Sequence, residues 1–133
     1  MSEEKSISIK DEYDIVSARS VGKQMAAEIG LGIVDQSRIA TAVSELARNI
    51  VLYAGTGVVT FRRLNDGGRS GLEIVASDSG PGIADVELAM QDGYTSGNGL
   101  GVGLPGTKRL MDEFEIKSEV GKGTRVMIRK WGR

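Results

Sequence analysis

Two polar side chains, Glu45 and Asn49, stand four residues apart in a segment whose apolar residues repeat with helical spacing. At about 100° per residue, such positions share one face of a helix. Most pairs of this kind form a solvated helix face, but asparagine is a weak helix former in a stretch of good ones. A carboxylate beside an amide oxygen is what a site needs to hold a hydroxyl proton and a hydrated magnesium ion. The pair is therefore a candidate for such a site.

A second candidate is Asp78, which ends a buried-looking strand and is followed by Ser-Gly-Pro-Gly at positions 79–82. Taken alone, an aspartate in this context usually caps the turn that follows. The alternative is that its carboxylate accepts a hydrogen bond from an adenine amino group. Gly80 and Gly82 would then let the chain pass close to the base. Both interpretations stay open at this point.

The third candidate is the glycine-rich segment 97–104, Gly-Asn-Gly-Leu-Gly-Val-Gly-Leu. It has no core-packing rationale and could be a flexible surface loop. However, it leads directly into a predicted helix whose first turn contains Pro105, a position that suits proline. Free amide groups and a positive helix end would then face the same spot, which favours an anion such as phosphate.

Composition narrows the chemistry. The 133 residues include no cysteine and no histidine, which excludes disulfides, thiolate nucleophiles, Ser-His-Asp triads, HExxH zinc sites and phosphohistidine. Any general base must be a carboxylate or a lysine. The net charge of −1 and the lack of a basic stripe give no support to nucleic-acid binding. We find neither a membrane-spanning apolar run nor a signal-peptide pattern, and so expect a cytoplasmic protein with no membrane partner.

Apolar periodicity predicts the elements that position these residues. Asp11 is the predicted cap of a helix over residues 12–29, and Asp35 that of a second helix over residues 35–53. The apolar stripe of the second helix, which we expect to face inward, is Ile39, Val43, Leu46, Ile50 and Tyr53. Strands are predicted at residues 6–10, 57–64, 72–76, 115–119 and 124–130, with further helices at 85–90 and from Pro105 to Phe114.

The order of these elements is strand, two helices, hairpin, helix and hairpin. It predicts an α+β fold: a two-layer sandwich in which helices cover one face of a mostly antiparallel mixed sheet. We expect a single domain over residues 1–133. Residues 101–106 satisfy G-x-G-x-x-G but do not follow a strand in a βαβ unit, so a dinucleotide-binding fold is not expected. A P-loop and the H-R-D kinase motif are both missing from the sequence.

Taken in order, the motifs resemble those of the GHKL ATPase and kinase superfamily, which includes DNA gyrase, MutL and the histidine kinases. Residues 45–49 match its N box, 78–82 its first glycine box, 99–104 the second and 121–124 the last. One box would be a weak signal, whereas four in sequence are specific. Nearly the whole chain is similar to the short anti-sigma-factor serine kinases, most of all to the RsbT-type switch kinases of the bacterial stressosome.

This resemblance implies a Bergerat-type ATP site that uses magnesium. It assigns Glu45 as general base, Asn49 as magnesium ligand, and Asp78 as the acceptor for the adenine amino group. The implied nucleotide-binding set is Asn49, Asp78, Gly80, Gly82, Thr95, Ser96, Gly99, Leu100, Gly101, Val102, Gly103, Leu104 and Thr124. Thr95 and Ser96 would belong to the ATP lid, and amides of residues 99–104 would cradle the phosphates.

The chain departs from the superfamily in one respect. Longer-lidded members place a basic residue against the terminal phosphate, but residues 93–106 contain no lysine or arginine. Lys108, Arg109, Arg125 or a residue of a partner could supply this charge.

The resemblance also implies partners. RsbT-type kinases phosphorylate serine and threonine on STAS-domain scaffold proteins and, once released, activate a PP2C-type phosphatase in a sigma-factor response. Two alternatives are a non-catalytic ATP-binding adapter and an ATPase fragment of a gated machine such as gyrase. Glu45 separates the first alternative from a kinase, because an adapter has no need of a carboxylate one turn before Asn49.

Overall fold

The computed structural model describes residues 4–83, 90 and 103–132 of the chain. Its elements are β1 (Glu4–Ile9), α1 (Glu12–Glu28), α2 (Ile33–Asn49), the π-helical turn η1 (Ile50–Ala54), β2 (Gly57–Asp66), β3 (Arg69–Asp78), α4 (Gly103–Leu110), β4 (Glu113–Glu119) and β5 (Gly123–Trp131). The short helix predicted at 85–90 falls almost wholly outside the described residues. No described helix is long and apolar enough to cross a membrane.

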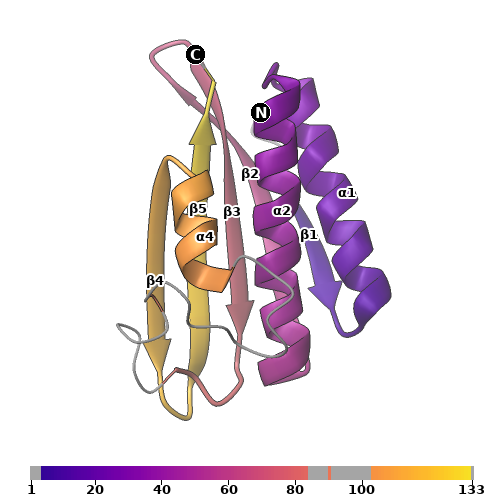
Figure 1. Cartoon of the computed structure of the whole chain (residues 1–133), viewed down its shortest axis with the longest axis vertical. Coiled ribbons are helices and arrows are strands. Elements are labelled where there is room, and N and C mark those ends of the chain that lie inside the picture. Colours follow the sequence, from indigo (N-terminus) through magenta and orange to yellow (C-terminus); the bar gives the residue numbers. More distant parts are fainter. Residues whose placement is uncertain (1–3, 84–89, 91–102, 133) are drawn as a thin grey trace.

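The five strands form one sheet in the order β1-β2-β3-β5-β4, and every pairing between them is antiparallel. The helices α1, α2 and α4 lie on the same face of this sheet (Figure 1). The predicted α+β two-layer sandwich, with helices on one face of a mostly antiparallel sheet, is thus confirmed.

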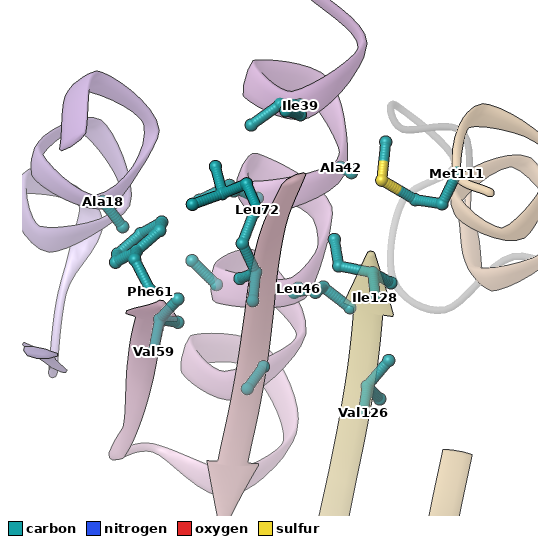
Figure 2. Packing of buried hydrophobic residues seen from close by; sticks show 14 of the residues in the cluster. Ala18, Ile39, Ala42, Leu46, Val59, Phe61, Leu72, Met111, Val126 and Ile128 are labelled. Atoms are coloured by element: carbon teal, nitrogen blue, oxygen red, sulfur yellow. The ribbon is translucent and has the colours of Figure 1, made fainter. Parts of the chain in front are cut away.

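The core lies between the helices and the sheet. Alternate side chains of the strands point toward the helices, as the two-residue period of a strand requires, and these include Val59, Phe61, Leu72 and Ile128. In Figure 2 Ala18 of α1 lies against Phe61, and Leu46 of α2 lies beside Ile128. This packing fixes α2 over the middle of the sheet.

The two long helices begin in different ways. At the start of α1, Asp11 is the N-cap as predicted, and its carboxylate accepts a hydrogen bond from the Asp14 backbone N–H at 3.2 Å. The predicted cap of α2 is wrong, because the N-cap is Gly32 and the helix begins at Ile33. Asp35 lies in the first turn, and its carboxylate forms ion pairs with Arg38 and Lys130 instead.

The end of α2 also differs from the predicted helix. After Asn49 the backbone widens into η1, which closes with a hydrogen bond from the Gly55 N–H to the Ile50 carbonyl at 2.8 Å. This five-residue spacing shifts the side chains out of the 3.6-residue period. The prediction that Tyr53 faces inward is therefore wrong, and its side chain is 44% exposed. The other four residues of the predicted stripe are buried.

The last helix is shorter than predicted. Pro105 lies in the first turn of α4 as expected, but the helix ends at Leu110 and does not reach Phe114, which belongs to β4. Asp112 explains the early end, because its backbone N–H donates to the Arg129 carbonyl at 3.0 Å. The chain thus joins the sheet before another helical turn can form.

Candidate functional site

One end of the sheet carries a row of four directly opposed residues, Gly57, Asp78, Thr124 and Ser118, from β2, β3, β5 and β4. We call them the site row. Strand alternation places them on the helix-facing side, in line with the buried Ala76 and Val126. Figure 1 shows the end of β3, the start of β5 and the end of α2 together at the lower end of the molecule. The end of α2 and the site row therefore lie at the same end of the molecule.

Asp78 combines the two roles considered for it. Its Oδ1 accepts a hydrogen bond from the Gly80 N–H at 2.9 Å, which is the turn-capping role. Within the described residues its Oδ2 accepts no hydrogen bond. One oxygen thus stabilises the turn, while the other is available to a ligand at the edge of the helix-covered face.

The glycines beside Asp78 are required by space and backbone geometry. A Cβ on Gly82, where φ is +77°, would lie 2.3 Å from the Glu119 carbonyl oxygen. One on Gly80 would lie 2.6 Å from the Ala54 Cβ. Both distances are far below a van der Waals contact. Among the described residues, these close contacts explain Gly80 and Gly82 without a ligand, so the predicted approach to a base is untested.

Thr124 is linked to its neighbour in the site row. Its Oγ1 is 2.7 Å from the Ser118 Oγ, which in turn accepts a hydrogen bond from the Ile83 N–H at 2.7 Å. Ser118 thereby fixes both Thr124 and the chain that leaves Asp78. The motifs did not point to Ser118. The predicted hairpin could have found it, because pairing around Gly121 places Ser118 opposite Thr124.

A hollow of about 400 Å³ opens at this end. It is lined by Asp78, Thr124 and Ser118, by their strand neighbours Ser77, Arg125 and Lys117, and by residues of the β4–β5 turn. Its size is in the range of small-molecule sites. Glu45 and Asn49 are not among its lining residues. The described residues thus place three members of the site row, Asp78, Thr124 and Ser118, at the hollow, and they hold the helical pair separately on α2.

The Glu45 side chain is buried, with only 6% of the residue exposed. Its Oε1 accepts a hydrogen bond from Arg48 Nη1 at 2.5 Å. Its Oε2 accepts one from the Gly103 N–H at 3.3 Å. The helix α4 begins at Gly103, so the carboxylate of the predicted general base contacts the amino end of this helix. Sequence reasoning did not single out Arg48.

Asn49 is the last residue of α2 and is half-buried, immediately before the π-helical turn. Turns of this type are frequent at functional sites. Its side chain makes no hydrogen bond with any described residue. No cluster of three or more acidic residues close enough to hold a metal occurs in the described part of the chain. The role of Asn49 as a magnesium ligand therefore stays a prediction.

The predicted phosphate-binding segment is described only at its end. Thr95, Ser96, Gly99, Leu100, Gly101 and Val102 lie outside the described residues. Gly103 is the first residue of α4, and Leu104 is buried in the core, where it anchors that helix. The amino end of a helix offers free N–H groups and a partial positive charge. Gly103 thus lies where the sequence predicts an anion.

Among the cations considered as substitutes for a basic lid residue, Arg125 is disfavoured. It alternates with Thr124 along β5 and so points to the sheet face away from the helices. There it lines a second hollow with Thr60 and Glu73, and it also borders the first hollow at the end of the sheet. Lys108 and Arg109 lie in the last turn of α4, away from its amino end.

Comparison with known proteins agrees with this geometry. Residues 9–130 match the family described as the histidine kinase-like ATPase domain. The chain belongs to this family. Over 131 residues it is 51% identical to the serine/threonine-protein kinase RsbT of Bacillus subtilis strain 168, covering 98% of both chains. Over 120 residues it is 33% identical to the anti-sigma F factor of Thermoanaerobacter sp. strain X514, covering 86% of this chain and 82% of that one.

Among solved structures, the RsbU and RsbW domains of a Mycobacterium tuberculosis protein superpose with a TM-score of 0.63 at 19% identity. The match covers all of this chain and 33% of that one. At this identity the similarity concerns the fold alone. It shows that the two chains share the same two-layer fold.

Proposed function

We propose that this protein transfers the γ-phosphate of Mg-ATP to a serine or threonine of a STAS-domain scaffold protein. When released from that scaffold, it would bind and activate a PP2C-type phosphatase in a stress or sigma-factor pathway. The enzyme class, a serine/threonine-protein kinase, follows from the 51% identity to a kinase of this class over 98% of both chains. The partners are our proposal.

The observation that carries the proposal is the placement of Glu45. An ionisable side chain is rarely buried without a partner or a task, and this carboxylate contacts the first amide of α4. If phosphate occupies the amino end of α4, Glu45 lies beside it. A hydroxyl group approaching the terminal phosphate could then give its proton to Glu45. A protein that only bound ATP would not need this carboxylate.

The remaining residues fit an adenine nucleotide. The Oδ2 of Asp78, which accepts no hydrogen bond from a described residue, can accept one from the adenine amino group, and Thr124 lies directly opposite Asp78. Asn49 has an amide oxygen available for magnesium, a cation that usually takes few protein ligands and several from phosphate and water. When bound, magnesium would supply charge compensation for the phosphates.

Phosphoryl transfer requires few catalytic side chains. Phosphoryl transfer depends mainly on positioning and charge stabilisation, with little covalent participation by side chains. The packed helix α2 holds Glu45 and Asn49 in place, while the sheet holds Asp78 and Thr124. Because these elements share one core, the proposed base and the adenine-binding residues are held in fixed relation.

The proposal of partner switching rests on the relatives. One is named a serine/threonine-protein kinase and the other an anti-sigma F factor. Such a protein would act in the cytoplasm, where its regulators are found. Exposed apolar side chains at Tyr13, Val16 and Leu52 offer surface for protein contacts.

The decisive experiment incubates the purified protein with labelled ATP, magnesium and individual STAS-domain proteins of the same genome. Label on a hydroxyl amino acid of one of them is expected. The same assay then adds the PP2C-type phosphatase and compares its activity with phosphorylated and unphosphorylated scaffold. If nucleotide binds but no partner acquires label, the protein is an adapter and the kinase proposal is wrong.

A further inference from the structure

The two oxygens of the Glu45 carboxylate are held from opposite sides. Arg48, one turn further along α2, donates to Oε1 at 2.5 Å. The Gly103 N–H donates to Oε2 at 3.3 Å. Of these two contacts, the one to Gly103 lies at the amino end of α4, where phosphate is expected. Bound phosphate would compete for that amide, whereas the contact with Arg48 would remain.

The burial of Glu45 makes the arginine contact important. An ionised carboxylate that is only 6% exposed requires hydrogen bonds to offset its lost hydration. Once phosphate takes the Gly103 amide, Arg48 is the remaining partner among the described residues. A guanidinium group is also suited to fixing a carboxylate, because its donors are planar and rigid.

We propose that Arg48 is a positioning residue for the kinase reaction, and this inference rests on the proposed function. By holding Oε1, it fixes the Glu45 side chain so that Oε2 faces the amino end of α4. Nucleotide binding at that end frees Oε2 from Gly103, and Oε2 then accepts the proton of the substrate hydroxyl. Arg48 acts through Glu45 and does not bind the nucleotide.

The same helix offers a matched control. Arg38 and Asp35 form an ion pair with the same three-residue spacing at the other end of α2, at 2.9 Å. The Asp35 side chain is 20% exposed, whereas the Glu45 side chain is 8% exposed. The Asp35–Arg38 pair also lies far from α4's amino end. Arg38→Ala therefore removes a similar pair without touching the proposed site.

The first test measures single-turnover phosphoryl transfer to a STAS protein that the wild type labels, together with Mg-ATP affinity by calorimetry. Arg48→Ala is expected to lower the transfer rate about 10- to 100-fold, the scale of a misplaced catalytic group. The affinity should change less than about threefold. Arg48→Lys should restore part of the rate, and Arg38→Ala should leave it unchanged.

The double variant gives the sharper result. If Arg48 acts only through Glu45, then Glu45→Ala and Glu45→Ala/Arg48→Ala will transfer phosphate at the same residual rate. A further loss in the double variant would overturn the proposal. So would a loss of Mg-ATP affinity as large as the loss of rate, because Arg48 would then be a phosphate-binding cation.

A crystal structure of Arg48→Ala tests the inference even if no partner is phosphorylated. The Glu45 carboxylate is expected to leave Gly103 or to occupy several rotamers. A Glu45 side chain that keeps its contact with Gly103 in this variant contradicts the inference. Absence of transfer by the wild-type protein would instead count against the proposed function. The two failures are therefore distinguishable.

Discussion

Two rows of directly opposed residues cross the same sheet and differ in how their polar groups are paired. The first is the site row. The second, which we call the charge row, consists of Arg62, Glu73, Arg129 and Glu113 on β2, β3, β5 and β4. Its side chains alternate in charge and lie on the face away from the helices.

Every member of the charge row is paired with its neighbour. Glu73 is only 8% exposed and contacts Arg62 at 3.0 Å and Arg129 at 2.7 Å. Arg129 also contacts Glu113 at 3.1 Å. The pairing raises the pKa of Arg129, chiefly through its hydrogen bond to Glu73. Opposite charges placed directly across strands stabilise a sheet.

The site row is different because its acidic residue is only half satisfied. Asp78 uses Oδ1 for the turn at Gly80 and leaves Oδ2 without a partner among the described residues. Natural proteins seldom leave polar groups unpaired where water is partly excluded. The contrast predicts that charges in one sheet serve two purposes. We expect the saturated pairs to contribute to stability, and we expect Asp78, which is incompletely paired among the described residues, to contact a ligand.

Glu45→Ala is expected to produce the largest effect. General-base assistance is worth about 10²- to 10⁴-fold, so phosphoryl transfer should fall by that factor while Mg-ATP still binds. Single-turnover transfer and calorimetry on the same preparation test this. An equal loss of nucleotide affinity would show that Glu45 belongs to the binding site and not to the chemical step.

Asp78→Asn tests whether Asp78 Oδ2 accepts a hydrogen bond from the adenine amino group. Asparagine keeps an acceptor for the Gly80 N–H but loses the charge offered to the adenine amino group. Hydrogen bonds to charged groups contribute about 1.5–3 kcal/mol, so the affinity for ATP should fall about 10- to 100-fold. The urea midpoint should stay near that of the wild type. Unchanged affinity would mean that Asp78 only caps its turn.

Glu73→Gln is the complementary change in the charge row. Glutamine keeps the size of the side chain but loses the charge shared by Arg62 and Arg129. We expect a loss of about 1–3 kcal/mol in unfolding free energy, because one partner of a largely buried pair is removed. Urea unfolding measures this loss, and the ATP affinity should not change. Together, Glu73→Gln and Asp78→Asn separate an effect on unfolding free energy from an effect on ATP affinity.

The sequence predicted the layers because these depend on local patterns, and the family resemblance pointed to two members of the site row, Asp78 and Thr124. Apolar periodicity located the helix α2, and turn residues located the two hairpins, from which the pairing of Asp78 with Thr124 follows once β3 and β5 are neighbours. Residues that depend on distant partners were not predicted. The Asp35 carboxylate forms an ion pair with Lys130 and does not cap α2. The role proposed for Arg48 depends on Gly103, which lies 58 residues after Glu45 in the sequence and contacts the same carboxylate.

The π-helical turn marks another limit of sequence patterns. The spacing of apolar residues continued evenly through Tyr53, so nothing local indicated that the helix would widen after Asn49. The turn ends at Gly55 with a φ of +85°, a conformation that suits glycine. That glycine predicts a helix end but not its type. The wider turn redirects the chain into β2 and exposes Tyr53.

Glu113→Gln, at the edge of the charge row, is expected to have the smallest effect. The indole N–H of Trp131 donates to Glu113 Oε2 at 2.6 Å, and this bond is the main reason that the pKa of Glu113 lies below its ordinary value. A lowered folded-state pKa stabilises the protein above the unfolded-state value of about 4.3, and the contribution is lost as the pH falls through the folded-state pKa.

The Glu113 side chain is 43% exposed, so solvent screening limits its contribution to roughly 0.2–1 kcal/mol. Glu113→Gln should therefore lower the unfolding free energy slightly at pH 7. The difference from the wild type should shrink as the pH falls below about 4.3 and disappear once the pH lies below the folded-state pKa of Glu113. Glu115→Gln is the control, because Glu115 lies on the same strand and, among the described residues, pairs only with the exposed Lys117. Urea unfolding at several pH values measures both variants. A difference that persists at low pH would show that Glu113 contributes through packing and not through its charge.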